Sequence, residues 1–305
     1  MGSTVRVIPR LDIKGPNLIK GIQFDGHRVL GTAEQFADFY YRAGADELIY
    51  QDTVASLYRR NSILDLVERT ASRIFIPLTG AGGIRSVEDV RALLRAGADK
   101  VAINTAATEN PMLLRDVASA FGSQCVVSSI EAFRRPHGRY EVWVDYGRQP
   151  TGLDVLEWAK RVVDLGAGEI LLTSINRDGM GRGFDTDLVA QVSDAVPVPV
   201  IASGGAGNAG HFAEAVQVGH ADAVAAASVF HYQYAVPVDK PYMSYGEARL
   251  RMGEQIDSGN IDFLNHGYGR QRSIPVSPAS IDDVKLAMAA AGVPVRATWA
   301  TEVVA

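Results

Sequence analysis

Ile76-Pro77-Leu78-Thr79-Gly80-Ala81-Gly82-Gly83-Ile84 has a counterpart later in the 305-residue chain, Val198-Pro199-Val200-Ile201-Ala202-Ser203-Gly204-Gly205-Ala206. In both stretches a short apolar run with a proline leads into a pair of glycines, and the two pairs are 122 residues apart. An apolar run bounded by glycine is typical of a buried strand in a parallel sheet. The repeat therefore predicts the same strand and turn in each half of the chain.

Three more landmarks repeat in the same order at nearly the same spacing. They are Ala45-Asp46-Glu47-Leu48-Ile49 with Ala167-Gly168-Glu169-Ile170-Leu171, Gly97-Ala98-Asp99-Lys100-Val101 with His220-Ala221-Asp222-Ala223-Val224, and Leu11-Asp12-Ile13 with Ile130-Glu131-Ala132. Each half then holds four strand–helix units. Eight such units predict an α/β fold, a (β/α)8 barrel built from two duplicated half-barrels. A doubly wound open sheet is the alternative, but it explains neither the duplication nor the count of eight.

Apolar runs of strand length alternate with amphipathic runs of helix length along most of the chain. We expect barrel strands at residues 5–11, 47–51, 77–79, 100–104, 126–130, 170–174, 200–203 and 223–227. We expect helices at residues 32–43, 62–74, 86–96, 110–122, 154–165 and 280–290, and a hairpin at 140–145. Residues 15–26 are expected to form a mobile loop after the first strand.

One long segment interrupts this alternation. Residues 233–279 contain many prolines, glycines and tyrosines, and only one short helix is expected there, at 247–256. Because the segment follows the eighth strand, it is expected on the catalytic face of the barrel. We therefore expect a single barrel domain over residues 1–305 that carries an insertion at 233–279.

The composition narrows the class of protein. With 47 % hydrophobic and 21 % charged residues, the chain is typical of a globular protein rather than a disordered or fibrous one. A net charge of −5 argues against a general nucleic-acid surface. The single cysteine, Cys125, cannot form an internal disulfide. No apolar run of about 18 residues and no signal-peptide core is present, so we expect a cytoplasmic protein without membrane spans.

The glycine pairs predict binding sites for anions. A glycine turn at the end of a strand lets backbone N–H groups approach a phosphate closely. Residues after the next strand supply further N–H and hydroxyl groups. The candidate sites are Gly82, Gly83, Asn104 and Thr105 in the first half, and Gly204, Gly205, Ala227 and Ser228 in the second. Two opposed sites suit a substrate with a phosphate at each end, whereas the simpler alternative is that the glycines only make tight turns.

Two carboxylates occupy equivalent places in the two halves. Asp12 and Glu131 end the first strand of each half, so we expect them on opposite sides of the barrel mouth. A carboxylate in an apolar run is costly unless it is used or paired, and two facing carboxylates suit general acid–base catalysis. Salt bridges to Lys14 or Arg134 are the structural alternative. Lys20, in the expected loop, could close over an anionic substrate or be an ordinary exposed lysine.

Four charged residues stand at the starts of expected strands, at the other end of the barrel. They are Arg6, Glu47, Lys100 and Glu169. Two cations and two carboxylates can form a ring of ion pairs there, and a stabilising role is usual for that face. The six histidines show no ligand spacing, so no metal site is expected.

Together these motifs resemble the cyclase subunit of imidazole glycerol phosphate synthase, HisF. The resemblance covers residues 5–232 and 280–296 and is carried by specific motifs. They are Ile8-Pro9-Arg10-Leu11-Asp12-Ile13-Lys14, Lys20-Gly21, Gly97-Ala98-Asp99-Lys100-Val101-Ala102-Ile103-Asn104-Thr105-Ala106, Gly168-Glu169-Ile170-Leu171-Leu172-Thr173-Ser174-Ile175-Asn176-Arg177-Asp178-Gly179, Ala202-Ser203-Gly204-Gly205-Ala206-Gly207 and Ala227-Ser228-Val229-Phe230-His231.

The resemblance implies a lyase that takes ammonia from a glutaminase subunit docked at the N-terminal face of the barrel. Ammonia passes through the barrel to a phosphorylated ribulosyl substrate, which gives imidazole glycerol phosphate and an aminoimidazole carboxamide ribotide. The implied roles are acid–base catalysis by Asp12 and Glu131, an ammonia gate at the ring of four charges, a partner contact at Asp99, and substrate contacts at Lys20, Thr173, Asp178 and Gly179. No cofactor is implied.

The chain departs from the family pattern at several positions. Glu131 replaces the usual aspartate, Arg10 replaces the usual cysteine, and residues 80–83 read Gly-Ala-Gly-Gly instead of Val-Gly-Gly-Gly. One extra methylene moves a carboxylate by about 1 Å, and a displacement of that size can cost about 10²-fold in rate. The alternative is therefore a HisF-like paralogue that channels ammonia for amidination of a surface sugar. The sister isomerase of histidine synthesis is a weaker match, because it needs no ammonia gate.

Overall fold

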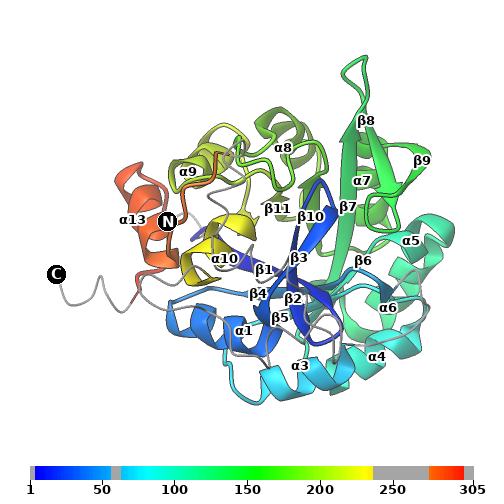
Figure 1. The fold of residues 1–305 in the computed structure, drawn as a ribbon. Helices are drawn as coiled ribbons and strands as arrows, with labels where there is room; N and C mark the ends of the chain where they lie inside the picture. The colour runs from blue at the N-terminus through cyan, green and yellow to red at the C-terminus, as the bar shows by residue number, and fades with distance from the viewer. Residues whose placement is uncertain (1–3, 56–62, 236–274, 299–305) are drawn as a thin grey trace.

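Eight parallel strands close into a barrel in the computed structural model, which describes residues 4–55, 63–235 and 275–298 (Figure 1). The ring runs in the order β1-β4-β5-β6-β7-β10-β11-β12, and β12 pairs back onto β1. Its strands are β1 (Arg6–Lys14), β4 (Leu48–Asp52), β5 (Leu78–Ala81), β6 (Lys100–Ile103), β7 (Val126–Arg134), β10 (Glu169–Ser174), β11 (Val200–Ser203) and β12 (Ala223–Ala226). The (β/α)8 barrel predicted from the repeat is confirmed.

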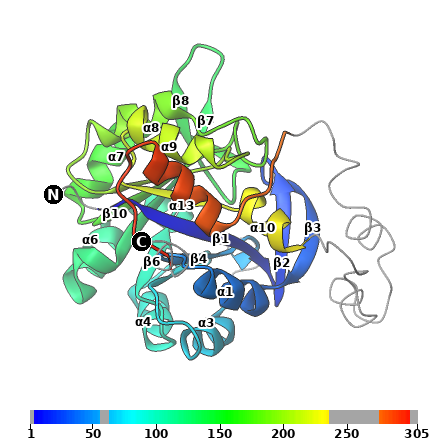
Figure 2. The ribbon, with the colours of Figure 1, turned by 90° about the vertical axis from the view of Figure 1, so that its left-hand side faces the viewer.

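Helices cover the outside of the barrel, and the last of them, α13, packs beside α9 (Figure 2). They are α1 (Ala33–Arg42), α3 (Leu64–Ala71), α4 (Val87–Arg95), α5 (Thr105–Glu109), α6 (Met112–Phe121), α7 (Val155–Asp164), α8 (Thr186–Ser193), α9 (Gly210–Gln217), α10 (Ser228–Ala235) and α13 (Ile281–Ala290), with the 3-10 turn η1 (Ser123–Cys125). Helix α10 takes up residues 233–235, and the rest of the expected insertion up to 274, with its expected helix, lies outside the described residues. No helix in the described ranges is long and apolar enough to cross a membrane.

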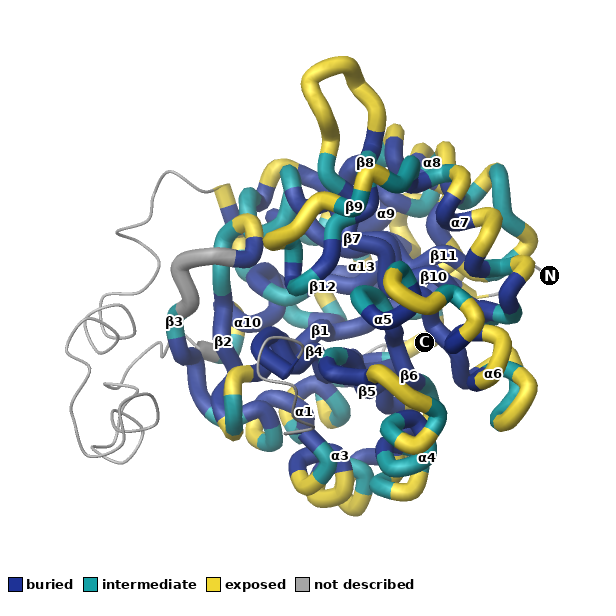
Figure 3. Tube along the Cα trace, turned by 90° about the vertical axis from the view of Figure 1, so that its right-hand side faces the viewer, coloured by how far each residue is buried: buried dark blue, intermediate teal, exposed yellow. Residues whose placement is uncertain are grey.

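Two antiparallel hairpins extend from the C-terminal ends of β1 and β7. They are formed by β2 (Asn17–Ile22) and β3 (Asp25–Thr32), and by β8 (Tyr140–Val144) and β9 (Gln149–Asp154). The prediction of an irregular loop at residues 15–26 is therefore wrong, because β2 pairs with β1 and places Ile19 opposite Asp12; the mobility of this segment stays a prediction. Both hairpins follow the first strand of a half-barrel, so the duplication includes them. The turn between β7 and β8 projects from the barrel and is exposed (Figure 3).

Side chains from alternate strand positions fill the barrel in layers, as strand geometry requires. The middle layer is apolar and buried: Ile8, Ile49, Ala81, Ala102, Val127, Leu171, Ile201, Ala223 and Ala225. Above it, toward the C-terminal ends of the strands, lies a buried polar layer: Arg10, Gln51, Ser129, Thr173 and Ser203. Below it are the charged residues at the strand starts. The polar layer thus forms the floor of the binding site at the barrel mouth.

Candidate functional site

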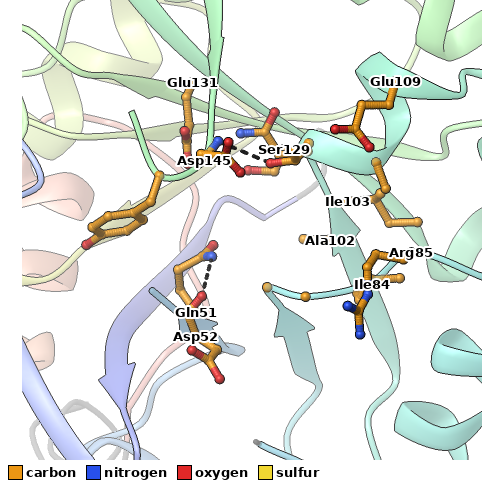
Figure 4. A pocket seen from close by; sticks show the side chains of 16 residues that line it. Gln51, Asp52, Ile84, Arg85, Ala102, Ile103, Glu109, Ser129, Glu131 and Asp145 are labelled. Atoms are coloured by element: carbon orange, nitrogen blue, oxygen red, sulfur yellow. Dashed lines mark hydrogen bonds between the residues drawn. The ribbon is translucent and has the colours of Figure 1, made fainter. Parts of the chain in front are cut away.

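Two cavities open at the C-terminal ends of the strands. The larger, of about 380 Å³, is lined by residues from β4 to β7, including Gly82, Gly83, Asn104, Thr105 and Glu131 (Figure 4). The smaller, of about 20 Å³, lies between β1, β10, β11 and β12 and is lined by Asp12, Asp178, Gly179, Gly204, Gly205, Ala227 and Ser228, together with Arg10. The structure therefore brings each predicted phosphate set together, one set in each half of the barrel.

The glycine turns that border the cavities have a backbone that other residues rarely adopt. Gly82 has φ +99°, and a Cβ placed on it would lie 2.3 Å from the carbonyl oxygen of Asp52. Gly204 has φ +87°, and its Cβ would lie 2.8 Å from the carbonyl oxygen of Ser174. Each glycine thus passes close to the end of the preceding strand of its own half. The turn requires glycine whether or not an anion binds there.

Two of the predicted phosphate contacts already hold the neighbouring hairpin. The Asn104 side-chain amide donates to the carbonyl oxygen of Trp143 at 3.3 Å. The Thr105 hydroxyl accepts the N–H of Asp145 at 3.1 Å. These bonds fix the turn between β8 and β9 over the larger cavity. The Thr105 hydroxyl can still donate its own proton and the Asn104 amide has a second N–H, so both groups can also donate to an anion.

Asp12 is buried at the barrel mouth and pairs with an unexpected partner. The Arg10 Nε donates to Asp12 Oδ1 at 3.0 Å. The expected structural partners Lys14 and Arg134 are instead both exposed, so that alternative is wrong for Asp12. Tyr146 is buried in the turn after β8 and hydrogen-bonds to Asp12. Burial is the main cause that holds the pKa of this phenol well above its usual value, and the charge of Asp12 adds to it.

Glu131 is buried in the larger cavity and has a different environment. Its carboxylate accepts the N–H of Gly147 at 2.7 Å. Burial raises the pKa of Glu131 to about 7, against the opposing effects of the Arg10 charge and this hydrogen bond. A carboxylic acid with a pKa near neutrality can both give and take a proton, which suits general acid–base catalysis.

Two further predicted residues, Lys20 and Asp178, lie next to this pair. Lys20 is on β2 and only 5 % exposed, so the interpretation as an exposed loop lysine is wrong. Burial lowers the pKa of Lys20 to about 8, opposed by the charge of Asp178. Removal from water also raises the pKa of Asp178 to about 6, and Arg10 opposes that shift. Gly179 follows directly and packs against the backbone of Gly21 on β2.

The four charged residues at the strand starts form a closed ring at the opposite end of the barrel. Lys100 Nζ donates to Glu47 at 2.9 Å and to Glu169 at 2.8 Å. Arg6 donates to Glu47 at 2.6 Å and also pairs with Glu169. Glu47 further accepts the Thr79 hydroxyl at 2.7 Å. The ring of ion pairs expected from the strand starts is therefore present in the structure.

Asp99 has a structural role that the sequence repeat explains. Its carboxylate accepts the N–H of Leu78 at 2.9 Å. Two other aspartates at strand starts make the same bond, Asp46 to the N–H of Val7 at 2.8 Å and Asp222 to that of Val200 at 2.9 Å. The bond ties neighbouring strands together and accounts for an aspartate at this position without any partner.

Sequence reasoning missed two residues of the larger cavity. Asp52 is buried, and its Oδ1 accepts the N–H groups of Val54 and Ala55, which shapes the chain next to Gly82. Tyr146 sits in a turn with φ +57°. No motif marks an aromatic residue in such a turn, although the adjacent glycine, Gly147, was a usable signal.

In residues 4–55, 63–235 and 275–298, no cluster of His, Cys, Asp and Glu could hold a metal ion.

Comparison with known proteins identifies the family. Residues 6–235 match the model of the histidine biosynthesis protein family. The chain belongs to this family. It is 60 % identical over 210 residues to the imidazole glycerol phosphate synthase subunit HisF of Legionella pneumophila, an alignment that covers 69 % of this chain and 99 % of the relative. The resemblance to HisF is thereby confirmed, and the chain is a HisF-like homologue of a synthase subunit.

The same comparison shows how much of the HisF-like chain is additional. Because the alignment uses almost the whole of the Legionella relative, nearly a third of this chain has no counterpart in it. The family match likewise ends at residue 235, the last residue of α10. The residues after 235 therefore lie outside the family match.

Proposed function

We propose that this chain is the cyclase subunit of a glutamine amidotransferase that acts on a phosphorylated ribulosyl substrate. Its products are imidazole glycerol phosphate and aminoimidazole carboxamide ribotide. The observation that carries the proposal is the pair of cavities at one barrel end. Each is bordered by a glycine turn, and the two carboxylates at equivalent places, Asp12 and Glu131, line one cavity each. A substrate with a phosphate at each end would place its reacting centre between the two carboxylates.

The reaction assigned to this site needs protons to be moved in both directions. Ammonia attacks the ketose carbonyl, an elimination follows, and the ring then closes. Glu131, with a pKa of about 7, can protonate a departing oxygen and later take a proton back. Asp12, held by Arg10, is placed to accept a proton on the opposite side of the mouth.

The N-terminal face has features that support a glutaminase partner there. A cavity of about 390 Å³ opens at the starts of β5 and β6 and is lined by Ile74, Phe75, Pro77 and Asp99 among others. Phe75 is 80 % exposed, and an exposed aromatic side chain beside a hollow is typical of a binding surface. The ring of ion pairs lies at the same end of the barrel, where ammonia from such a partner would enter.

A second candidate function is ammonia transfer without cyclase chemistry, in the amidination of a surface sugar. The specific observation in its favour is that the ring of ion pairs is complete, whereas the mouth has Glu131 in place of aspartate and a buried guanidinium at Arg10. In this case another protein would perform the final reaction.

The test is turnover of the bisphosphate substrate by the purified protein with a high concentration of ammonium salt, followed by chromatography of the ribotide. We expect Asp12→Asn and Glu131→Gln each to lower kcat by about 10²- to 10⁴-fold. Glu157→Gln, an exposed carboxylate on α7, is the matched control. Absence of turnover, or turnover that neither variant lowers, would overturn the cyclase function and favour the second candidate.

A further inference from the structure

Arg10 is a feature of the mouth that the family pattern does not explain. Its side chain is almost completely buried in the polar layer, with 3 % of the residue exposed. We propose that Arg10 is a positioning residue that holds Asp12 in the orientation of the proton acceptor, whereas Glu131, which has a serine at the equivalent position of its strand, is the proton donor. The proposal deepens the proposed function, on which it rests for the identity of the substrate.

The guanidinium is anchored across three strands. Besides the bond from Nε to Asp12, Nη1 lies 3.2 Å from the Thr173 hydroxyl and 3.5 Å from the Ser203 hydroxyl. These partners stand on β1, β10 and β11, so the planar group is held by the barrel wall itself. A guanidinium held in this way fixes the orientation of the carboxylate that it contacts.

The half-barrel repeat shows that this charge is not duplicated. Asp12 and Glu131 are 119 residues apart, and the residue at the same distance from Arg10 is Ser129. Asp12 therefore has a cation two positions before it on its strand, whereas Glu131 has a serine. The two carboxylates occupy equivalent places in the fold but have unequal electrostatic surroundings.

The charges that face Glu131 support the same assignment. They are Arg10 and Asp12 on β1, Asp178 after β10, and, around the larger cavity, Asp52, Arg85, Glu109 and Asp145, with the phenol of Tyr146. Arg85 and Glu109 are exposed, so water screens them. Burial and the neighbouring charges of Asp12 and Asp178 favour the protonated form of Glu131, whereas the charge of Arg10 opposes it.

The test measures the protonation of Glu131 directly. Carboxyl NMR of protein labelled with ¹³C in glutamate side chains gives the titration midpoint of Glu131, and Glu131→Gln assigns its signal. In Arg10→Gln and Arg10→Cys, we expect the midpoint to rise by about one pH unit, because a nearby positive charge is lost. Arg10→Lys keeps the charge and should leave the midpoint in place, as should Arg139→Gln, an exposed control.

Kinetics supply the second readout. The alkaline limb of the kcat profile should move to higher pH in the two neutral variants. The kcat of Arg10→Lys should fall about tenfold with KM unchanged, because an ammonium group cannot contact Asp12, Thr173 and Ser203 as the planar guanidinium does. An unshifted midpoint in the neutral variants, or an unchanged kcat in Arg10→Lys, would overturn the proposal. If the neutral variants do not fold, Arg10→Lys decides it. If the wild type shows no turnover, the cyclase function fails, but the NMR midpoints still decide the role of Arg10.

Discussion

Glu131 is a buried carboxylic acid whose described hydrogen bond comes from a peptide N–H, that of Gly147. Its equivalent in the other half, Asp12, has a guanidinium in contact. The sequence predicted where both carboxylates would lie, because each ends the first strand of a half-barrel. It did not predict how they differ, because the surroundings of Glu131 come from the β8–β9 turn and from strands that are distant in the chain.

The raised pKa of Glu131 has a consequence for stability. The folded protein holds a proton on Glu131 between pH 4.5 and about 7, whereas the unfolded chain releases it. We therefore expect the free energy of unfolding to fall as the pH rises through this range, by roughly 3 kcal/mol from this group. Urea unfolding at several pH values measures it. The fall should be smaller in Glu131→Gln, and an equal fall in both proteins would contradict the assignment.

The elements that depend on local pattern were predicted well. Apolar runs located the barrel strands, and Ser86, which accepts the N–H of Asp89, marked the start of α4 as expected. The hairpin of β2 and β3 was missed, because glycines at 15, 21 and 26 indicate a loop when they are read locally. Its strands are stabilised by pairing with β1. Such tertiary pairing leaves no local pattern in the sequence. Lys20 was assigned to an exposed loop for the same reason.

The β2–β3 hairpin can be tested by hydrogen exchange. We expect the amides of β2 to exchange at least about 10²-fold more slowly than those of the exposed turn at residues 136–139, because strand pairing protects them. Mass spectrometry of peptides that cover the two segments measures the difference. Exchange of the β2 amides within seconds would instead show the mobile loop that local reading indicated.

The molecule as a whole has two chemically different ends separated by an apolar layer. The ring of ion pairs closes one end, and the polar layer with its two cavities forms the other. Both ends were predictable, because the starts and ends of parallel barrel strands gather on opposite faces. The size of the cavities and the burial of Arg10 were not predictable, since they depend on how side chains from all eight strands pack together.

Lys100 provides a test of the ring. In Lys100→Met, Arg6 is the remaining cation in the ring for both Glu47 and Glu169. Glu47 is only 1 % exposed. We expect the free energy of unfolding to fall by about 2–4 kcal/mol, because a buried carboxylate loses its partner. Lys160→Met, which removes an exposed lysine on α7, should change it by less than about 0.5 kcal/mol. Equal small effects in the two variants would mean that the ring contributes little to stability.

The unequal halves of the mouth bear on the direction in which a ligand lies. In a perfectly duplicated barrel, a molecule with two similar ends would bind in two orientations of equal energy. Here the two orientations differ in energy for two reasons. The cavities have unequal volumes, about 380 and 20 Å³, and one half has a guanidinium where the other has Ser129. A small number of substitutions in one half of a repeated scaffold is thus enough to make a nearly symmetric barrel mouth bind a ligand in one direction.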